Sequence, residues 1–414
     1  MTDRRVAVTG IGAITPIGHG ADGLWAGVLR HRSAVSRLTR FDASPFPSRI
    51  AAQIDDFDPT DHLDVRRARR LDRFSQLAVA SARMAALDAG WGERVRDPER
   101  TGTWIGSALG GVAFGEEQHD AYVARGARAV SPTLATAVYG GAGAANVATD
   151  LGVRGPAIGN ANSCASGATA IGQAAHAIRM GIVDAALAGG AEAPLAPLTF
   201  GAFALIRVLS TRNDDPTTAS RPFDVDRDGF VMAEGAAVLA LEAWEVAEAR
   251  GAPILAEVCG FGASADAHHP TAPLPDGSAA GAAISAALRD AGIGPEQVEY
   301  VNAHASSTVL NEPAEARALH HALGPRAATV PVSGTKGLHG HALGATGAIE
   351  AAITILALQH GVLPGTANLR QLDPACELCV VRDPTPAPGT ALALSTSFGF
   401  GGLNAALVLR RAAG

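Results

Sequence analysis

Short apolar runs alternate with amphipathic stretches along the whole chain. Four runs of β-branched and small residues predict buried strands that end in turns: residues 4–18, 101–111, 184–194 and 298–308. Helical spacing of apolar positions predicts helices between them, for example over 74–89 and 277–291. Strands that alternate with helices in this way indicate an α/β fold.

The alternation begins again near residue 250. Strand-and-turn segments at 4–18 and 253–264 each open a series of alternating elements, and no low-complexity linker separates the two series. We therefore predict two related halves, residues 1–250 and 251–414, that pack as one unit. The second half closes with two strand-like runs joined by a glycine-rich turn, over 391–409.

The composition indicates a globular protein and argues against a membrane or nucleic-acid-binding protein. The 414 residues are 47% hydrophobic and 18% charged, which is typical of a globular protein with a large core. A net charge of −7 gives no general attraction to nucleic acid or to acidic membranes. The N-terminus lacks the apolar segment of a signal peptide, and the longest charge-free apolar segment, 193–206, is too short to cross a bilayer. We expect a soluble cytoplasmic protein that does not contact membranes or nucleic acid.

Small residues surround one of the four cysteines. Cys164 lies in GNANSCASGATAIGQAAHAIRMG (159–181), where the apolar spacing predicts a helix over 165–180 that Gly181 ends. At a helix N-terminus, unpaired N–H groups and the helix dipole favour a thiolate, so Cys164 is a candidate nucleophile. A buried packing cysteine is the alternative. The other cysteines are too sparse for a disulfide framework.

Two histidines and the single lysine are candidate partners for this cysteine. His304 follows a strand-like run and His341 precedes a predicted helix, both in turns of small residues, where histidines can assist a nucleophile. Lys336 is the one lysine among 33 basic side chains. A compact ammonium oriented by Glu350 would explain it, and chance in an arginine-rich chain is the alternative.

A glycine-rich turn near the C-terminus is the last candidate element. STSFGFGGLN (395–404) places Gly401 between Phe398, Phe400 and further glycines. Such a turn can be mobile and can offer a backbone N–H to an oxyanion. A tight hairpin without a catalytic role is the alternative.

Six segments in this order resemble the β-ketoacyl-acyl-carrier-protein synthases, which are condensing enzymes of the thiolase superfamily. They are the stretch around Cys164, RPFDVDRDGFVMAEGA (221–236), DAHHPTAPLPDG (266–277), YVNAHASST (300–308), TKGLHGHALGATGAIE (335–350) and SFGFGGLN (397–404). The resemblance covers nearly the whole chain and is similar to the synthase II type. It implies a thiolase-like α/β fold in which two related halves form a layered α-β-α-β-α core.

The resemblance also implies a decarboxylative Claisen condensation in fatty acid or polyketide chain elongation. Cys164 would take an acyl chain from a carrier protein, and His304 and His341 would bind the thioester oxygen of malonyl-carrier protein while it loses carbon dioxide. Lys336 and Glu350 match a supporting ion pair. The amides of Cys164 and Phe400 match oxyanion donors. No metal or organic cofactor is expected, because the substrates arrive on the phosphopantetheine of an acyl carrier protein.

Further positions match family residues that bind the substrate or a partner. Leu109 and Phe203 match residues that line and gate the acyl tunnel, although plain core packing would also explain Leu109. Six arginines match a patch for an acidic carrier protein, with a solvated helix face as the alternative: Arg66, Arg67, Arg69, Arg70, Arg128 and Arg207. The family expectation is a homodimer, or a heterodimer with a chain-length-factor subunit.

The chain departs from the family pattern beside both histidines. Ala305 and Ser306 replace the usual glycine and threonine, 337–339 differ from the usual run, and Asn311 and Glu312 displace an acidic residue. These differences favour a specialised polyketide or polyene pathway over ordinary fatty acid synthesis.

Two related protein classes fit less well. A non-catalytic chain-length-factor-like subunit would lack the active cysteine, which is present here as Cys164. A degradative thiolase would need a second cysteine in the C-terminal glycine turn, and residues 395–402 contain none.

Two unrelated classes depend on weak motifs. Gly10 and Gly12 begin a dinucleotide-binding fingerprint, but Thr15 occupies the place of its third glycine. Cys376 and Cys379 supply only half a zinc site, and CELCVV is better predicted as a strand. The histidine pairs that could complete a metal site are 268–269 and 320–321.

Overall fold

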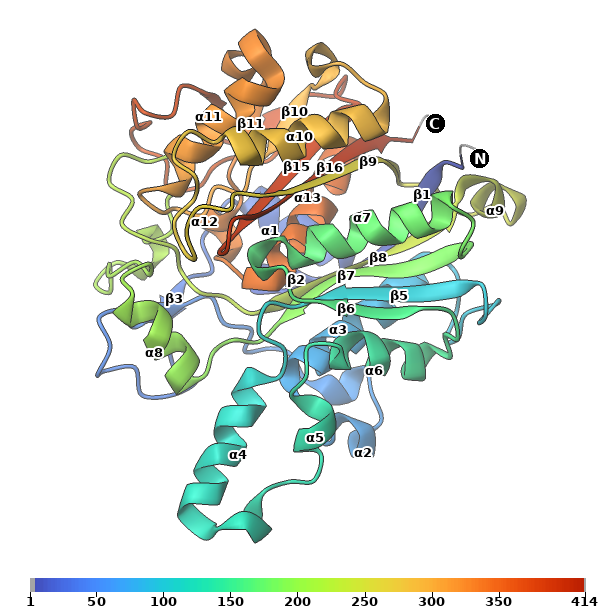
Figure 1. Cartoon of the computed structure of the whole chain (residues 1–414), viewed down its shortest axis with the longest axis vertical. Helices are drawn as coiled ribbons and strands as arrows, with labels where there is room; N and C mark the ends of the chain where they lie inside the picture. The colour runs from blue at the N-terminus through green and yellow to red at the C-terminus, as the bar shows by residue number, and fades with distance from the viewer. Residues whose placement is uncertain (1–3, 413–414) are drawn as a thin grey trace.

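A mixed sheet of twelve strands runs through the computed structural model, which describes residues 4–412 (Figure 1). Its strands are β1 (Val6–Thr15), β2 (Gly18–His19), β5 (Thr101–Gly106), β6 (Ala157–Asn160), β7 (Ala185–Glu192), β8 (Gly235–Ala243), β9 (Ala256–Ala265), β10 (Tyr300–Asn302), β11 (Pro331–Ser333), β13 (Cys379–Val380), β15 (Leu392–Gly399) and β16 (Leu403–Arg411). Two small pairs lie outside it: β3 (Ser36–Arg37) with β4 (Ile50–Ala51), and β12 (Val362–Leu363) with β14 (Thr385–Pro386).

Helices cover and separate the two halves of this sheet. They are α1 (Gly20–Arg30), α2 (Val65–Ala68), α3 (Arg73–Asp88), α4 (Val112–Arg125), α5 (Leu134–Ala137), α6 (Ala142–Leu151), α7 (Ser166–Arg179), α8 (Pro197–Leu205), α9 (Trp244–Ala249), α10 (Ser278–Ala291), α11 (Asn311–Leu323), α12 (Lys336–His339) and α13 (Thr346–His360). No helix within residues 4–412 is long and apolar enough to cross a membrane.

Both halves of the sheet have the same topology. The spatial order is β1-β8-β7-β5-β6 in the first half and β9-β16-β15-β10-β11 in the second. In each half the first three strands pair antiparallel and the outer three run parallel. The halves join where β1 pairs with β9, with Val8 opposite Ala256. This repeat confirms two related halves, while the boundary at residue 250 stays a prediction.

Two helices form the central layer between the halves. α7 packs on β7 and β5 from the first half and on β9 from the second, and α13 packs on α7, β8 and β15. Residues 346–358 of α13 are buried on every side, as expected for a helix enclosed by protein. α3 and α6 cover one outer face, and α10 and α11 cover the other (Figure 1). The core therefore has the predicted α-β-α-β-α layers.

A repeated glycine pair sets how closely the outer helices approach the sheet. A Cβ on Gly12 of β1 would lie 1.9 Å from the Ser81 carbonyl oxygen of α3, and one on Gly262 of β9 would lie 2.1 Å from the Ala283 oxygen of α10. The motif TGIGA and its counterpart CGFGA thus serve helix–sheet packing. The dinucleotide interpretation of Gly10 and Gly12 is therefore wrong.

Most predicted elements appear close to their predicted places. The predicted helices 74–89, 165–180 and 277–291 are α3, α7 and α10, and the C-terminal pair of runs is the hairpin β15–β16. The segment CELCVV is strand only at Cys379–Val380, because its single parallel neighbour β11 is itself three residues long.

We expect Gly12→Ala and Gly262→Ala each to lower the free energy of unfolding by about 1–3 kcal/mol, because the new methyl group would overlap helix backbone. Gly389→Ala is the matched control, since a Cβ there meets no atom within 4 Å. Thermal unfolding measures the change. Equal melting temperatures for Gly12→Ala and Gly389→Ala would contradict this account of the packing.

Candidate active site

Cys164 lies in a 3-10 turn, Ser163–Ala165, that runs directly into α7. Ser163 has a φ of 51°, a left-handed conformation that turns the chain from β6 toward the helix. The cysteine is 7% exposed and belongs to an apolar cluster with Leu343, Phe230 and Met232. The structure therefore places Cys164 at a helix start, as the sequence predicts.

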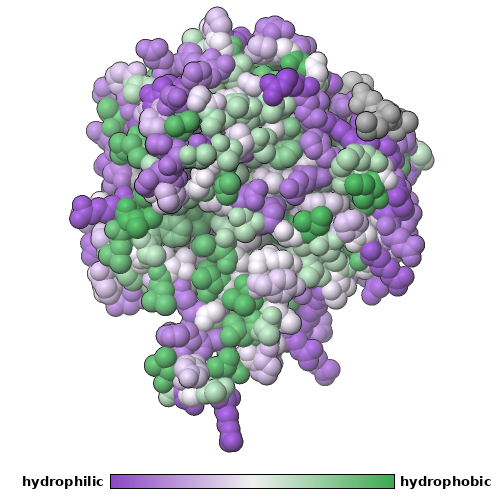
Figure 2. All heavy atoms as spheres, in the orientation of Figure 1, coloured by the Kyte–Doolittle hydropathy of each residue, from purple (hydrophilic) through white to green (hydrophobic). Residues whose placement is uncertain are grey.

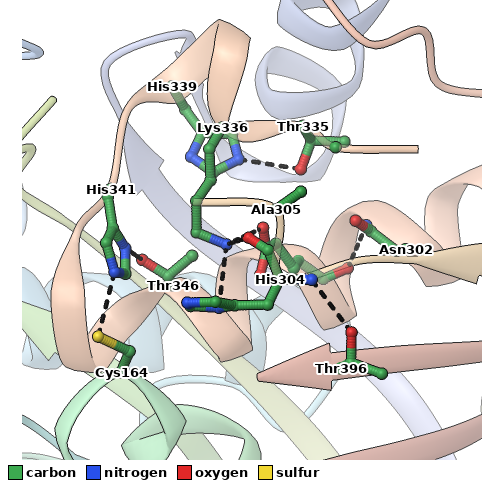
Figure 3. Close-up of polar contacts among 12 residues, drawn as sticks. Cys164, Asn302, His304, Ala305, Thr335, Lys336, His339, His341, Thr346 and Thr396 are labelled. Carbon is green, nitrogen blue, oxygen red and sulfur yellow. Dashed lines mark hydrogen bonds and ion pairs between the residues drawn. The ribbon is translucent and has the colours of Figure 1, made fainter. Parts of the chain in front are cut away.

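Both predicted histidines face this cysteine (Figure 3). His341 Nε2 lies 3.1 Å from Cys164 Sγ, and the His304 and His341 rings lie 5.3 Å apart between centroids. His341 Nδ1 is hydrogen-bonded to Thr346 Oγ1 at 3.0 Å, which fixes the plane of the ring. The backbone of His341 is fixed as well, because its N–H donates to Val231 O.

The lone lysine and Glu350 form a fully buried ion pair next to His304. Lys336 Nζ donates to Glu350 Oε1 at 2.6 Å and also contacts the His304 carbonyl oxygen (Figure 3). It lies 3.4 Å from His304 Nδ1. Because an ammonium only donates hydrogen bonds, Nδ1 is the acceptor and a neutral His304 carries its proton on Nε2.

Burial and the lysine keep both histidines neutral. Burial, with the Lys336 charge as the second cause, lowers the pKa of His304 and of His341 well below the usual value. Burial raises the pKa of Glu350, which the Lys336 charge opposes. The site therefore contains two neutral imidazoles beside the buried contact between Lys336 and Glu350.

The expected thiolate character of Cys164 is wrong for the resting site. Burial raises the pKa of Cys164 to about 11, although the Lys336 charge and hydrogen bonds from Ser163 and the Phe400 backbone act in the opposite direction. The increase in the pKa from desolvation of the thiolate is larger than the decrease that the helix N-terminus provides. The residue is a thiol that needs a base, and His341 Nε2 is at hydrogen-bonding distance.

Glu315 on α11 is a site residue that the sequence did not indicate. Its carboxylate accepts hydrogen bonds from the backbone N–H groups of His304 and Ala305 and from Thr396 Oγ1. This fixes a strained loop, because Ala305 has a φ of 38° in the left-handed region. A glutamate eleven residues beyond the histidine has no recognisable motif, so only the fold could place it there.

Glu192 holds the loop that carries Leu109. It accepts the backbone N–H groups of Ala108, Leu109 and Gly344, and burial raises the pKa of this carboxyl to about 7. Leu109 lines the cavity in front of Cys164 as predicted. Sequence reasoning missed Glu192 because its partners come from two segments that are both distant from it in the chain.

His339, in the segment 337–339 that the sequence analysis singled out, lies next to the catalytic residues. It is buried, its Nε2 is hydrogen-bonded to Thr335 Oγ1 at 3.1 Å, and burial lowers its pKa to about 3. It is therefore a third neutral imidazole, which lies behind Lys336 rather than toward Cys164 (Figure 3).

The glycine-rich turn between β15 and β16 closes over the cysteine. A Cβ on Gly399 would lie 2.9 Å from the Cys164 backbone nitrogen, so the two segments touch. Phe400 stacks on Phe203 of α8 with centroids 6.1 Å apart, and Phe398 packs on His304. Gly401 has a φ of 82°, which favours glycine at that position.

These residues surround a cavity of about 500 Å³. Cys164, both histidines, Leu109 and Phe203 line it, and Arg207 lies among the lining residues. Figure 2 shows a hollow with apolar walls on the left of the view, near the tip of the β15–β16 hairpin. A cavity of this size and character fits a linear apolar chain with a few polar groups at its reactive end.

Five of the six predicted carrier-protein arginines are available at the surface. Arg66, Arg69 and Arg70 are exposed at and after α2, and Arg128 and Arg207 are exposed as well. Arg67 is different, because its guanidinium pairs with Asp150 at 2.5 Å and also donates to Asn146 O. Asp150 also pairs with Arg83, so the contact holds Arg67 within the fold but leaves one net positive charge in this group, and the role of Arg67 in carrier-protein binding stays a prediction.

Cys376 and Cys379, which were weighed as half a zinc site and set aside, lie outside the side-chain group that meets metal-ligand spacing within residues 4–412. Within residues 4–412, the cysteine, histidine and carboxylate side chains that meet metal-ligand spacing are Cys164, His304 and His341. Cys376 is buried and Cys379 is exposed.

Comparison with known proteins identifies the class. The family model described as "Beta-ketoacyl synthase, N-terminal domain" matches residues 3–247, and the one described as "Beta-ketoacyl synthase, C-terminal domain" matches residues 255–370. The chain therefore belongs to the β-ketoacyl synthase family, and it is a condensing enzyme of the acyltransferase type.

Individual relatives agree with this family. The chain is 42% identical to the 3-oxoacyl-[acyl-carrier-protein] synthase 2 of a Synechocystis species, over 99% of this chain and 98% of that one. A solved ishigamide ketosynthase/chain length factor has a TM-score of 0.92 and 34% identity, covering 100% of both chains. A type II polyketide ketosynthase solved with its acyl-carrier protein has a TM-score of 0.90 and 32% identity, covering 99% and 100%.

The raised pKa of Cys164 predicts how the thiol reacts with iodoacetamide. In a Cys379→Ser background, which lacks the exposed thiol, we expect the alkylation rate of Cys164 to keep rising from pH 7 to pH 10. Lys336→Met should slow alkylation at pH 8, because the Lys336 charge lowers this pKa. Intact-protein mass spectrometry follows the reaction, and a rate that levels off below pH 9 would contradict the assignment.

Proposed function

We propose that this protein elongates acyl chains in fatty acid synthesis by decarboxylative condensation of an acyl group on Cys164 with malonyl-acyl-carrier protein. The observation that carries the proposal is the contact between Cys164 Sγ and His341 Nε2 at 3.1 Å, beside neutral His304 in an apolar cavity. Similarity to synthase 2 enzymes over the whole chain favours fatty acid elongation over a polyketide pathway.

Acyl transfer uses the thiol, one imidazole and two backbone amides. His341 Nε2 accepts the thiol proton while Sγ attacks the thioester carbonyl. The backbone N–H groups of Cys164 and Phe400 stabilise the oxyanion that forms on the thioester carbonyl. The Phe400 N–H is hydrogen-bonded to the Cys164 sulfur, and Gly399 packs against the Cys164 nitrogen, so both donors are close to the reacting carbon. The carbon–sulfur bond to the carrier then breaks, and the imidazolium returns its proton to the departing thiolate.

Decarboxylation needs hydrogen-bond donors rather than a strong base. The malonyl carbon–carbon bond breaks, carbon dioxide leaves, and the electron pair moves onto the thioester oxygen as an enolate. The Lys336 contact at Nδ1 sets the proton of His304 on Nε2, which faces the cavity. His341 supplies the second donor in its other neutral tautomer, in which Nδ1 accepts a hydrogen bond from the Thr346 hydroxyl and Nε2 carries the proton. An imidazolium beside Lys336 would be strongly disfavoured, so the neutral donors are the stable state.

Condensation regenerates the cysteine. The enolate carbon attacks the acyl-Cys164 carbonyl, a new carbon–carbon bond forms, and the carbon–sulfur bond breaks to leave a β-ketoacyl thioester on the carrier and a thiolate on Cys164. The thiolate takes up one proton from solvent, which restores the thiol. The proposed reaction needs no metal or organic cofactor, because the leaving carbon dioxide supplies the carbanion. Intact Cys164 with both histidines disfavours the alternative of a non-catalytic partner subunit.

The exposed arginines support an acidic carrier protein as the partner that delivers both substrates. Arg66, Arg69 and Arg70 lie close together in the chain, and Arg128 and Arg207 are also exposed, on a chain of net charge −7. One structural relative is a ketosynthase solved in complex with its acyl-carrier protein. The cytoplasmic location expected from the sequence stays a prediction.

A homodimer is the assembly we propose, with the edge of the sheet as its interface. β6 is an outer strand whose residues 157–159 are exposed, and Ile158 is 40% exposed without a charged neighbour on the strand. Such an edge favours pairing with another strand. The segment from α4 to Gly140 also exposes large apolar side chains, which we include in the proposed interface: Tyr122, Val123, Val138 and Tyr139. A heterodimer with a chain-length factor is the second candidate, since structural relatives include such complexes.

We expect a panel of acyl-carrier proteins to leave an acyl mass on wild-type Cys164 and none on Cys164→Ala. Malonyl-carrier protein should then consume that mass. His304→Ala should still accept the acyl group but lose the condensation step by at least about a hundredfold, because His304 does not contact the sulfur and supplies an oxyanion donor. Intact-protein mass spectrometry measures both steps.

The exposed His268 gives a matched control, since His268→Ala should retain both steps. Acylation of Cys164→Ala, or normal condensation by His304→Ala, would contradict the assigned roles.

The proposed dimer interface can be tested by a substitution on β6. Ile158→Arg should convert a dimer into monomers, because it places a charge in the proposed strand pair. Analytical ultracentrifugation measures the mass, and Ile182→Arg, at an exposed position outside this face, should remain dimeric. A dimer that survives Ile158→Arg would place the interface elsewhere.

A further inference from the structure

Helix α8 forms one wall of the acyl cavity. It is short, and no side chain at its own N-terminus caps it. Its nine residues begin at Pro197, and its N-cap residue, Ala196, has no side chain that can cap the helix. Phe203 on this helix lines the cavity, stacks on Phe400 and meets Phe230 edge to face. The position of α8 therefore decides where the Phe203 ring closes the cavity.

A carboxylate from another helix supplies the missing cap. Glu116 of α4 accepts the backbone N–H of Leu198 at 2.7 Å, the N–H of Thr199 at 2.7 Å and the Thr199 hydroxyl at 2.6 Å. Pro197 has no N–H, and the N–H of Phe200 donates to Ala196 O. Glu116 thus satisfies the free donors of the first turn, and its charge matches the positive end of the helix.

The other end of this connection is anchored in the core. The N–H of Phe114, at the start of α4, donates to Asp72 Oδ2, and Asp72 also caps α3 through the N–H of Phe74. Asp72 is almost fully buried. Glu116 follows Phe114 by two residues, so it extends from a fixed point to α8.

We propose that Glu116 is a positioning residue that holds Phe203 against the acyl cavity and thereby sets the acyl-chain length that Cys164 accepts. This inference rests on the proposed function, because it concerns the same acylation step. Because Cys164 and Phe203 line the same cavity, we expect a long chain to meet the Phe203 ring and a short chain to end before it. Loss of the Glu116 cap loosens α8 and therefore favours long chains relative to short ones.

The test compares rates of Cys164 acylation by carrier proteins loaded with a four-carbon or a twelve-carbon chain, followed by intact-protein mass spectrometry. Glu116→Gln should raise the ratio of the long-chain rate to the short-chain rate by roughly three- to tenfold, since a charge-assisted cap is lost. Thr199→Val, which removes only the hydroxyl donor, should change the ratio in the same direction by less. Glu117→Gln, at an exposed carboxylate on the same helix, should leave the ratio unchanged.

A Phe203→Ala background separates positioning from general loosening. If Glu116 acts through Phe203, Glu116→Gln should not change the ratio further once the ring is absent. An unchanged ratio in Glu116→Gln, or the same change with and without Phe203, would overturn the inference while leaving the proposed function intact. A wild-type protein that accepts neither chain would overturn the proposed function, and this inference with it.

Discussion

The close contact between the two central helices is the constraint on which the site depends. A Cβ on Gly167 of α7 would lie 2.8 Å from the Ala348 nitrogen of α13, and one on Gly347 would lie 2.9 Å from the Ala168 nitrogen. The two glycines are related by the repeat, because each follows the first residue of its central helix. This contact brings both helix N-termini together, so that Cys164 before α7 meets His341 before α13. A larger residue at either glycine would separate the nucleophile from its base.

Burial then determines the protonation states that the chemistry uses. The side chains at the helix junction are buried, so isolated charges there are costly, and Lys336 and Glu350 pair with each other. Its ammonium disfavours a second positive charge on either imidazole. Neutral histidines can donate hydrogen bonds to an enolate oxygen, whereas a permanent imidazolium would bind an anion in every state of the reaction. The lone lysine thus controls the histidines rather than the substrate.

Polar groups around the site act mostly on the backbone. Glu315 holds the strained loop after His304, and Glu192 holds the loop of Leu109 together with the turn before α13. Glu116 caps the helix that carries Phe203. Each carboxylate accepts hydrogen bonds from backbone N–H groups that have no partner within a helix or strand. Such N–H groups occur here because several loops meet around one cavity, and buried N–H groups need an acceptor. The catalytic side chains are therefore precise because their loops are fixed, while the apolar wall at α8 depends on a single cap.

The sequence by itself determined the elements and the reacting groups. Alternating runs indicated the α/β layers, and the restart near residue 250 indicated two halves, because these patterns are local. Cys164, His304, His341 and Lys336 could be selected because nucleophiles, bases and a single lysine in turns of small residues are unusual in a sequence. The structure brings all four together.

Only the tertiary structure decided the charges and the supports. The sequence predicted a thiolate at Cys164 from its place at a helix start, but burial raises its pKa to about 11, and burial depends on both halves. Arg67 was predicted to belong to a carrier-protein patch, and only the fold shows that it pairs with Asp150, 83 residues away. Glu116 and Glu315 were not selected, because their partners come from distant segments. Local pattern fixes which groups a chain carries, whereas desolvation and long-range pairing fix what those groups can do.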